Sequence, residues 1–98
     1  MHIRVHKTPQ GTIIAACDDD LLGKVLTEGD KHLDLAKYAS FYGDSGTEEE
    51  LTNLLDGDFD SINLVGKKAV SVAIKAGIVG QTSVMHIKNI PYVQVYSI

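Results

Sequence analysis

The chain has 98 residues, of which 44% are hydrophobic and 22% charged, and its formal net charge is −4. This length allows one domain with a single core, and these fractions exclude a disordered protein. No apolar run approaches the roughly 20 residues that cross a membrane, and the first residues lack the apolar stretch of a signal peptide. We therefore expect a cytoplasmic protein with no membrane partner. A single cysteine, Cys17, excludes an internal disulfide.

Residues 1–7 alternate between apolar and polar side chains, which is the pattern of a half-buried β-strand. Residues 8–11 predict a turn, because proline presets its own backbone angle and glycine accepts a positive φ. Residues 12–17 are β-branched and apolar, so we expect them to pair back on the first strand as a hairpin.

The middle of the sequence is less regular. Leu33 and Leu35 alternate with polar residues and predict a third strand, with a bulge or turn ahead of it at residues 28–30. Residues 36–42 fit either a helix or an extended segment, and a loop follows at residues 43–46. The backbone between the first hairpin and the helices is therefore only partly predicted.

Two helices are predicted next. Residues 47–50, Thr-Glu-Glu-Glu, form a capping box at the start of the first helix, which buries leucines and stops at a glycine. Residues 60–77 carry apolar side chains at helical spacing and predict the second, better buried helix. Asp60 is its favoured N-cap; if the helix starts at Asn63 instead, residues 61–64 are extended and Gly66 lies in the first turn. Gly77 is expected to end the helix in a left-handed conformation.

Two strands complete the prediction. Residues 84–88 alternate, residues 89–91 form a turn, and residues 92–98 form the last strand, with tyrosines and a glutamine on one face and valines on the other. The predicted order is β-β-β-α-α-β-β. We therefore expect a single α+β domain over residues 1–98, with a mostly antiparallel sheet and helices packed on one face.

The charges are separated along the chain. All 13 acidic residues lie between Asp18 and Asp60, while residues 1–17 and 61–98 hold basic residues and no acid. Such asymmetry indicates a polyanionic or charged partner. Cations hold phosphates, and exposed aromatic rings stack on unpaired bases, with roughly 1–3 kcal/mol per base. The candidate RNA-binding residues are Arg4, His6, Lys67, Lys68, Lys88, Tyr92 and Tyr96. A solvated basic face, with the tyrosines covering the sheet, is the alternative, because the aromatic motif of recognised RNA-binding sheets is absent.

Other chemistries find less support in the sequence. The glycine–lysine pairs at residues 23–24 and 66–67 lack the eight-residue spacing of a phosphate loop, which favours glycine used for close packing. Three aspartates follow Cys17, which disfavours a thiolate, and they lack the spacing of a calcium loop. We expect an inert, buried cysteine, no catalytic residue, no metal and no cofactor. An enzyme using Cys17 or these aspartates remains the alternative.

Five sequence blocks carry a resemblance to a known family. They are Ala16-Cys17-Asp18, Leu21-Leu22-Gly23-Lys24, Glu28-Gly29, Phe41-Tyr42-Gly43, and Asn63-Leu64-Val65-Gly66-Lys67 running into Ala73-Ile74-Lys75-Ala76-Gly77-Ile78-Val79. Together they span nearly the whole chain and resemble the small archaeal domain-of-unknown-function family 424. The resemblance implies an archaeal cytoplasmic protein, and a link to translation fits a family of this kind. It implies no activity and no site residue.

These observations favour a non-enzymatic binding module that contacts RNA or a ribonucleoprotein. The alternative is a protein-interaction adaptor or a homodimer with opposed acidic and basic faces. In that case the partner is a basic protein or a second copy of the chain.

Overall fold

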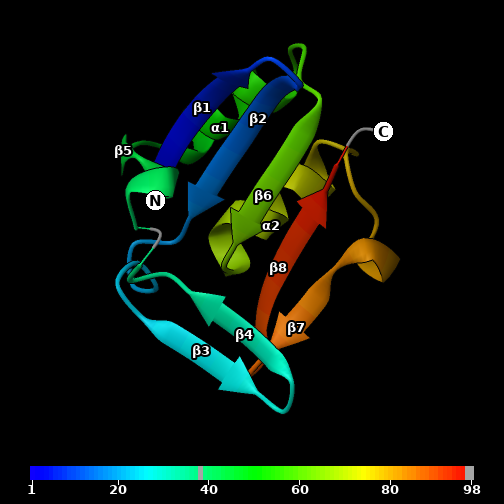
Figure 1. Ribbon diagram of the computed structural model, residues 1–98. Helices are drawn as coiled ribbons and strands as arrows, with labels where there is room; N and C mark the ends of the chain where they lie inside the picture. Colours follow the sequence, from blue (N-terminus) through cyan, green and yellow to red (C-terminus); the bar gives the residue numbers. More distant parts are fainter. Residues whose placement is uncertain (38, 97–98) are drawn as a thin grey trace.

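The computed structural model describes residues 1–37 and 39–96. These residues form a six-stranded mixed sheet, two α-helices on one face of it, and a separate two-stranded hairpin beside its lower end (Figure 1). The order across the main sheet is β5-β1-β2-β6-β8-β7, and the hairpin pairs β3 with β4. The strands are β1 (His2–Thr8), β2 (Gly11–Cys17), β3 (Val25–Glu28), β4 (Lys31–Asp34), β5 (Asp44–Ser45), β6 (Ser61–Val65), β7 (Met85–Ile87) and β8 (Ile90–Val95). The helical elements are α1 (Glu48–Leu55), α2 (Lys67–Lys75) and the 3-10 turns η1 (Ala39–Tyr42) and η2 (Gln81–Ser83). The predicted α+β class is confirmed.

The predicted N-terminal hairpin is confirmed. β1 and β2 pair antiparallel, from His2 opposite Cys17 to Thr8 opposite Gly11. Gly11 has a φ of 133°, and a Cβ there would collide with the side chain of Asp60. The turn therefore needs glycine both for its backbone angle and for this close approach.

The predicted helix over residues 60–77 is wrong in its first third, because residues 61–65 form β6 at the centre of the sheet. β6 lies parallel to β2 and antiparallel to β8, so the sheet is mixed. A strand covered on both faces carries apolar residues on both, and this pattern cannot be distinguished from a buried helix by periodicity. Asp60 is not an N-cap: its Oδ2 accepts a hydrogen bond from the Thr12 amide at 2.7 Å and ties β6 to β2. Gly77, with a φ of 74°, follows the helix as predicted.

The N-terminus of helix α2 is capped by a side chain from a distant part of the sequence. Asp18, which follows β2, accepts hydrogen bonds from the amides of Lys68 at 3.0 Å and Ala69 at 2.9 Å. Gly66 precedes the helix with a φ of 110°, and a Cβ on it would collide with the Asp18 carboxyl group. The glycine–lysine pair at residues 66–67 therefore serves close packing, and the amides at the helix N-terminus already bind a carboxylate.

Residues 25–34 form a hairpin of two strands in place of the single predicted strand. β3 and β4 pair antiparallel, with Leu26 opposite Leu33. Residues 36–42, for which sequence left two alternatives, include the 3-10 turn η1. The capping box of α1 is confirmed: Thr47 Oγ1 accepts from the Glu50 amide at 3.1 Å, and Glu50 Oε2 accepts from the Thr47 amide at 3.4 Å.

The C-terminal hairpin turns earlier than predicted. Lys88 and Asn89 have φ values of 50° and 63° and form the two-residue turn between β7 and β8. Two consecutive left-handed residues match the twist of the paired strands. Pro91 thus lies within β8. The end of the predicted last strand, residues 97–98, lies outside the described residues.

The sheet is covered differently on its two faces. The helices lie on one face, and most of the apolar core lies between them and the sheet. On the other face the β3–β4 hairpin and η1 cover a second, smaller cluster of buried residues, which includes Cys17, Leu35, Ile87 and Tyr92. In Figure 1 no other helix or strand is drawn in front of β6 and the upper part of β8. Within the described residues, no helix is both long enough and apolar enough to span a membrane.

Candidate functional site

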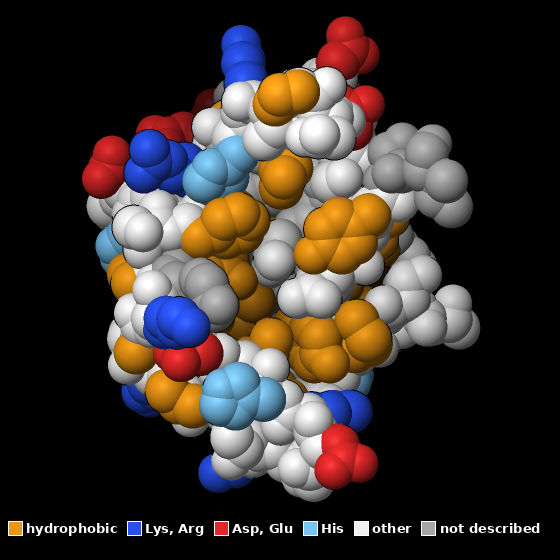
Figure 2. Space-filling view, viewed as in Figure 1, with side chains coloured by type: hydrophobic (Ala, Val, Ile, Leu, Met, Phe, Trp, Pro, Cys, Tyr) orange, Lys and Arg blue, Asp and Glu red, His pale blue; other side chains and the backbone are white. Residues whose placement is uncertain are grey.

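A hollow of about 600 Å³ lies on the sheet face opposite the helices, where the hairpin and η1 border β6 and β8. Figure 2 shows hydrophobic side chains gathered around a depression at the centre of this face. Pockets that hold small molecules typically measure about 300–1,000 Å³. We call this site the central hollow; its lining residues are His32, Leu33, Asp34, Lys37, Phe41, Tyr42, Asn63 and Gln94.

Two amide side chains form the floor of the central hollow. Asn63 of β6 and Gln94 of β8 stand directly opposite each other in the antiparallel register. Such pairs place their Cβ atoms about 4.5–5.5 Å apart. The hydroxyl group of Tyr42 donates to Asn63 Oδ1 at 3.0 Å, which orients the amide and leaves its NH₂ group as a donor. The floor therefore presents adjacent hydrogen-bond donors and acceptors.

Aromatic rings form one wall. Phe41 stacks on His6 with ring centroids 4.4 Å apart and an interplanar angle of 13°, and Tyr42 meets Phe41 edge-on at 5.3 Å. His6 Nε2 lies 2.7 Å from the Phe41 carbonyl oxygen. Because that oxygen only accepts, Nε2 carries a proton. Burial raises the pKa of Tyr42, so its hydroxyl group remains a donor at neutral pH.

Charged side chains form the rim. His32, Asp34 and Lys37 line it. Asp34 Oδ1 accepts hydrogen bonds from the amides of Ala36 at 3.1 Å and Lys37 at 2.7 Å, which fixes the loop after β4. Arg4 Nη1 donates to the Ser40 carbonyl oxygen at 3.3 Å, so a further cation lies beside η1.

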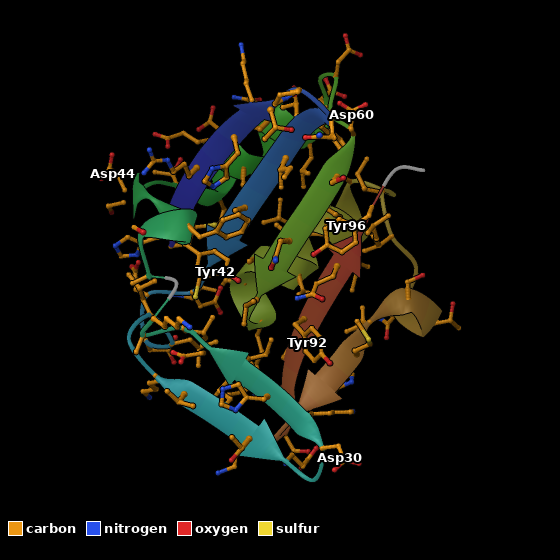
Figure 3. All side chains as sticks on the ribbon, viewed as in Figure 1. Asp30, Tyr42, Asp44, Asp60, Tyr92 and Tyr96 are labelled. Carbon is orange, nitrogen blue, oxygen red and sulfur yellow. The ribbon has the colours of Figure 1, made fainter. Side chains whose placement is uncertain are left out.

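The fold brings together only part of the predicted RNA-binding set. Arg4 and His6 are on the β1 face that continues into the central hollow, and Tyr96 is 59% exposed just after β8. Figure 3 shows Tyr42, Tyr92 and Tyr96 on the same side of the sheet. The expectation of an exposed ring at Tyr92 is wrong: the side chain is only 8% exposed, because the second cluster of buried residues encloses it.

The remaining predicted residues are elsewhere. Lys88 is in the turn between β7 and β8, and Lys67 and Lys68 begin α2 in the helical layer. The two basic ends of the sequence thus meet in one sheet, but their lysines do not join Arg4 on one face. The separation of acidic and basic residues along the sequence therefore predicted a larger basic surface beside the tyrosines than the fold provides.

All eight lining residues of the central hollow were missed by sequence reasoning, among them Phe41, Tyr42, Asn63 and Gln94. Asn63 interrupts a buried apolar run, which is a signal of a polar role. Its partner across the sheet is set by strand register, which the sequence does not reveal.

The cysteine behaves as predicted. Cys17 is fully buried, and its thiol has no disulfide partner. Burial, with a smaller contribution from the neighbouring aspartates, raises its pKa to about 12. The thiolate is therefore essentially absent at neutral pH, and Cys17 is a packing residue.

Comparison with known proteins places this arrangement in a family. The family model described as "Protein of unknown function (DUF424)" matches residues 5–98. The crystal structure of an uncharacterized conserved protein from Methanopyrus kandleri is similar, with a TM-score of 0.77 and 25% sequence identity. That similarity covers 97% of this chain and 89% of the Methanopyrus chain. Among curated proteins, none matches this sequence.

Proposed function

The chain belongs to the DUF424 family, whose function is unknown, and we propose that it is a non-enzymatic cytoplasmic module that binds single-stranded RNA, free or in a ribonucleoprotein. The observation that carries this proposal is the pair of amides, Asn63 and Gln94, on the floor of an aromatic-walled hollow. An unpaired base enters the hollow, where it contacts the amides of the floor and the aromatic rings of the wall.

The chemistry of a nucleobase fits this lining. A base has two apolar ring faces and a polar edge with donors and acceptors. Phe41 and Leu33 offer apolar contact for the faces, while Asn63 and Gln94 offer hydrogen bonds to the edge. Tyr96, exposed on the same side, offers a further stacking surface for a neighbouring base.

The rim supplies charge for the phosphate backbone. Lys37 is exposed and lines the central hollow, and the exposed Arg4 lies beside η1, where it donates to the Ser40 carbonyl oxygen. The Asp34 carboxylate at the same rim would repel a phosphate, but its Oδ1 is turned to the backbone, where it accepts hydrogen bonds from two amides. Only a few phosphates are contacted in this way, so we expect modest affinity with a shallow dependence on salt.

The thiol of Cys17 and the hydroxyl group of Tyr42 are poorly suited to catalysis. A nucleophile needs an activating base or a lowered pKa. The pKa of Cys17 is raised to about 12, and the Tyr42 hydroxyl group is held by Asn63. Neither group is activated for attack.

The test is fluorescence anisotropy with a labelled single-stranded RNA of about ten nucleotides, at salt concentrations from about 50 to 200 mM. Gln94→Leu removes one floor amide and should weaken binding about tenfold, which corresponds to about 1.4 kcal/mol. Gln10→Leu makes the same change in the exposed β1–β2 turn and should leave affinity unchanged. Absence of binding at the lowest salt, or equal affinity of the two variants, would contradict the proposal.

A further inference from the structure

A second groove lies on the helical side of the sheet and shares no residue with the central hollow. It runs between α2 and the segment from η2 to β7, with a volume of about 400 Å³. Side chains of Val70, Ile74, Val84 and Pro91 give it an apolar lining. We call it the α2 groove.

Cationic side chains border this apolar lining. Lys67, Ser71 and Lys75 are spaced at i, i+4 and i+8 along α2 and so follow one side of the helix. Lys67 and Lys75 are exposed, and their Cα atoms are about 12 Å apart at the helical rise per residue. The side chain of His86 in β7 lies on the opposite wall.

No carboxylate opposes these cations within the groove. Its lining contains no Asp or Glu, and residues 61–98, which supply the whole lining, contain none either. Lys67 was grouped with the RNA-binding candidates on sequence alone, but it belongs to this groove and not to the central hollow. Lys67 also borders a hollow that contains Asp19 and Asp20, and Lys75 borders one that contains Glu48 and Glu49, so only the side of α2 that faces this groove is free of carboxylates.

We propose that the α2 groove binds an extended acidic segment of a partner protein, in which two carboxylates flank an apolar residue in the order acid-x-apolar-x-acid. In an extended chain these three side chains point the same way, and the two acids are about 13 Å apart. That spacing matches Lys67 and Lys75, and the apolar side chain between the acids reaches the half-buried Ile74 and Val84. The apolar lining favours a peptide over an RNA backbone, which has no apolar side chain to bury.

The segment is held by side chains and not by strand addition. The outer edge of β7 is the natural place for an added strand. Lys31 Nζ donates to the His86 carbonyl oxygen at 2.8 Å, so a lysine already occupies that edge. Recognition therefore depends on the charges and the apolar lining of the groove.

The test uses a labelled synthetic peptide, Ser-Glu-Ser-Leu-Ser-Glu-Ser with blocked ends, and the full chain. The double variant Lys67→Gln/Lys75→Gln should lose about tenfold or more in affinity. Lys68→Gln/Lys88→Gln removes the same charge outside the groove and should bind like the wild type. All four lysines are exposed, so both variants should keep the wild-type melting temperature. A peptide with serine in place of leucine should bind severalfold more weakly.

Three results would overturn the inference. The first is absence of peptide binding to the wild type at low salt. The second is an equal loss in the two double variants, which indicates general charge attraction. The third is a single-stranded RNA that displaces the peptide and loses affinity in Lys67→Gln/Lys75→Gln but not in Gln94→Leu, which would make the groove a phosphate-binding surface. If only Gln94→Leu loses RNA binding, the result concerns the central hollow and does not affect the conclusion from the peptide.

Discussion

The buried carboxylate of Asp18 caps helix α2 from 51 residues away, accepting a hydrogen bond from the Ala69 amide at 2.9 Å. Its second oxygen accepts from the Lys68 amide. This contact joins the carboxyl end of β2 to the helix that follows β6, and it leaves no free amide pair there for an external anion.

Removing this cap should destabilise the fold. Asp18→Ala leaves one buried and one partly buried amide without an acceptor, and we expect a loss of about 2–3 kcal/mol in the free energy of unfolding. Asp20→Ala, at an exposed position two residues on, should change it by less than about 0.5 kcal/mol. Urea unfolding followed by circular dichroism measures both; similar values for the two variants would remove the capping role.

Gly66 should be intolerant of a side chain. Gly66→Ala combines a φ of 110° with a collision against Asp18, so we expect a loss of about 3 kcal/mol or more. Gly23 has a φ of 91°, but an added Cβ would meet no atom within 4 Å, so Gly23→Ala should cost only the backbone strain, about 1–2 kcal/mol. Thermal melts compare the two, and an equal shift in both would exclude the steric contribution.

A charge in the buried face of α2 should unfold the protein. Val72 packs in the core between helices and sheet, and burying an unpaired carboxylate costs several kcal/mol out of a total of about 5–15 kcal/mol. Val72→Asp should therefore lack a cooperative melt. Val25→Asp, at a site that is 50% exposed, should retain one. A folded Val72→Asp protein with an unchanged melting temperature would contradict the packing of α2.

Alkaline pH should destabilise the protein through two buried acids. The pKa of Cys17 rises from 9.0 to about 12 on folding, and that of Tyr42 is also raised. Each group loses its proton more readily in the unfolded chain, so stability falls as pH rises above the unfolded pKa. For Cys17 the fall begins near pH 9 and amounts to about 1.4 kcal/mol per pH unit. Urea melts at pH 8 and pH 10.5 should show it, and Cys17→Ala should show a smaller fall because only Tyr42 remains.

The hydroxyl group of Tyr42 should matter for both stability and binding. Tyr42→Phe removes the donor to Asn63 and should cost about 1 kcal/mol of stability. It also releases the Asn63 amide from one orientation, so RNA affinity should fall. Anisotropy and a urea melt on the same sample test both effects; unchanged values in both would show that this hydrogen bond contributes little.

Much of the local structure was predictable because it depends on neighbours in sequence. The capping box at Thr47 and Glu50 is closed within four residues, and Gly77 ends α2 through its own freedom at positive φ. The first hairpin follows from alternation and a short turn. The α+β class and the placement of the helices on one face follow from the polarity of these elements, although the predicted order lacks β6 between the two helices.

The central hollow depended on contacts between distant segments. β6 reads as helix in isolation because both its faces are apolar, and only its place between β2 and β8 makes it a strand. That pairing sets Asn63 opposite Gln94, while the folded middle of the chain encloses Tyr92 and leaves Tyr96 open. The sequence alone determined the charge separation, the class of fold and the inert cysteine, since these rest on composition and local pattern. Strand register and the covering of one sheet face decided which polar groups meet, because hydrogen-bond pairing across a sheet joins residues whose separation in sequence carries no signal.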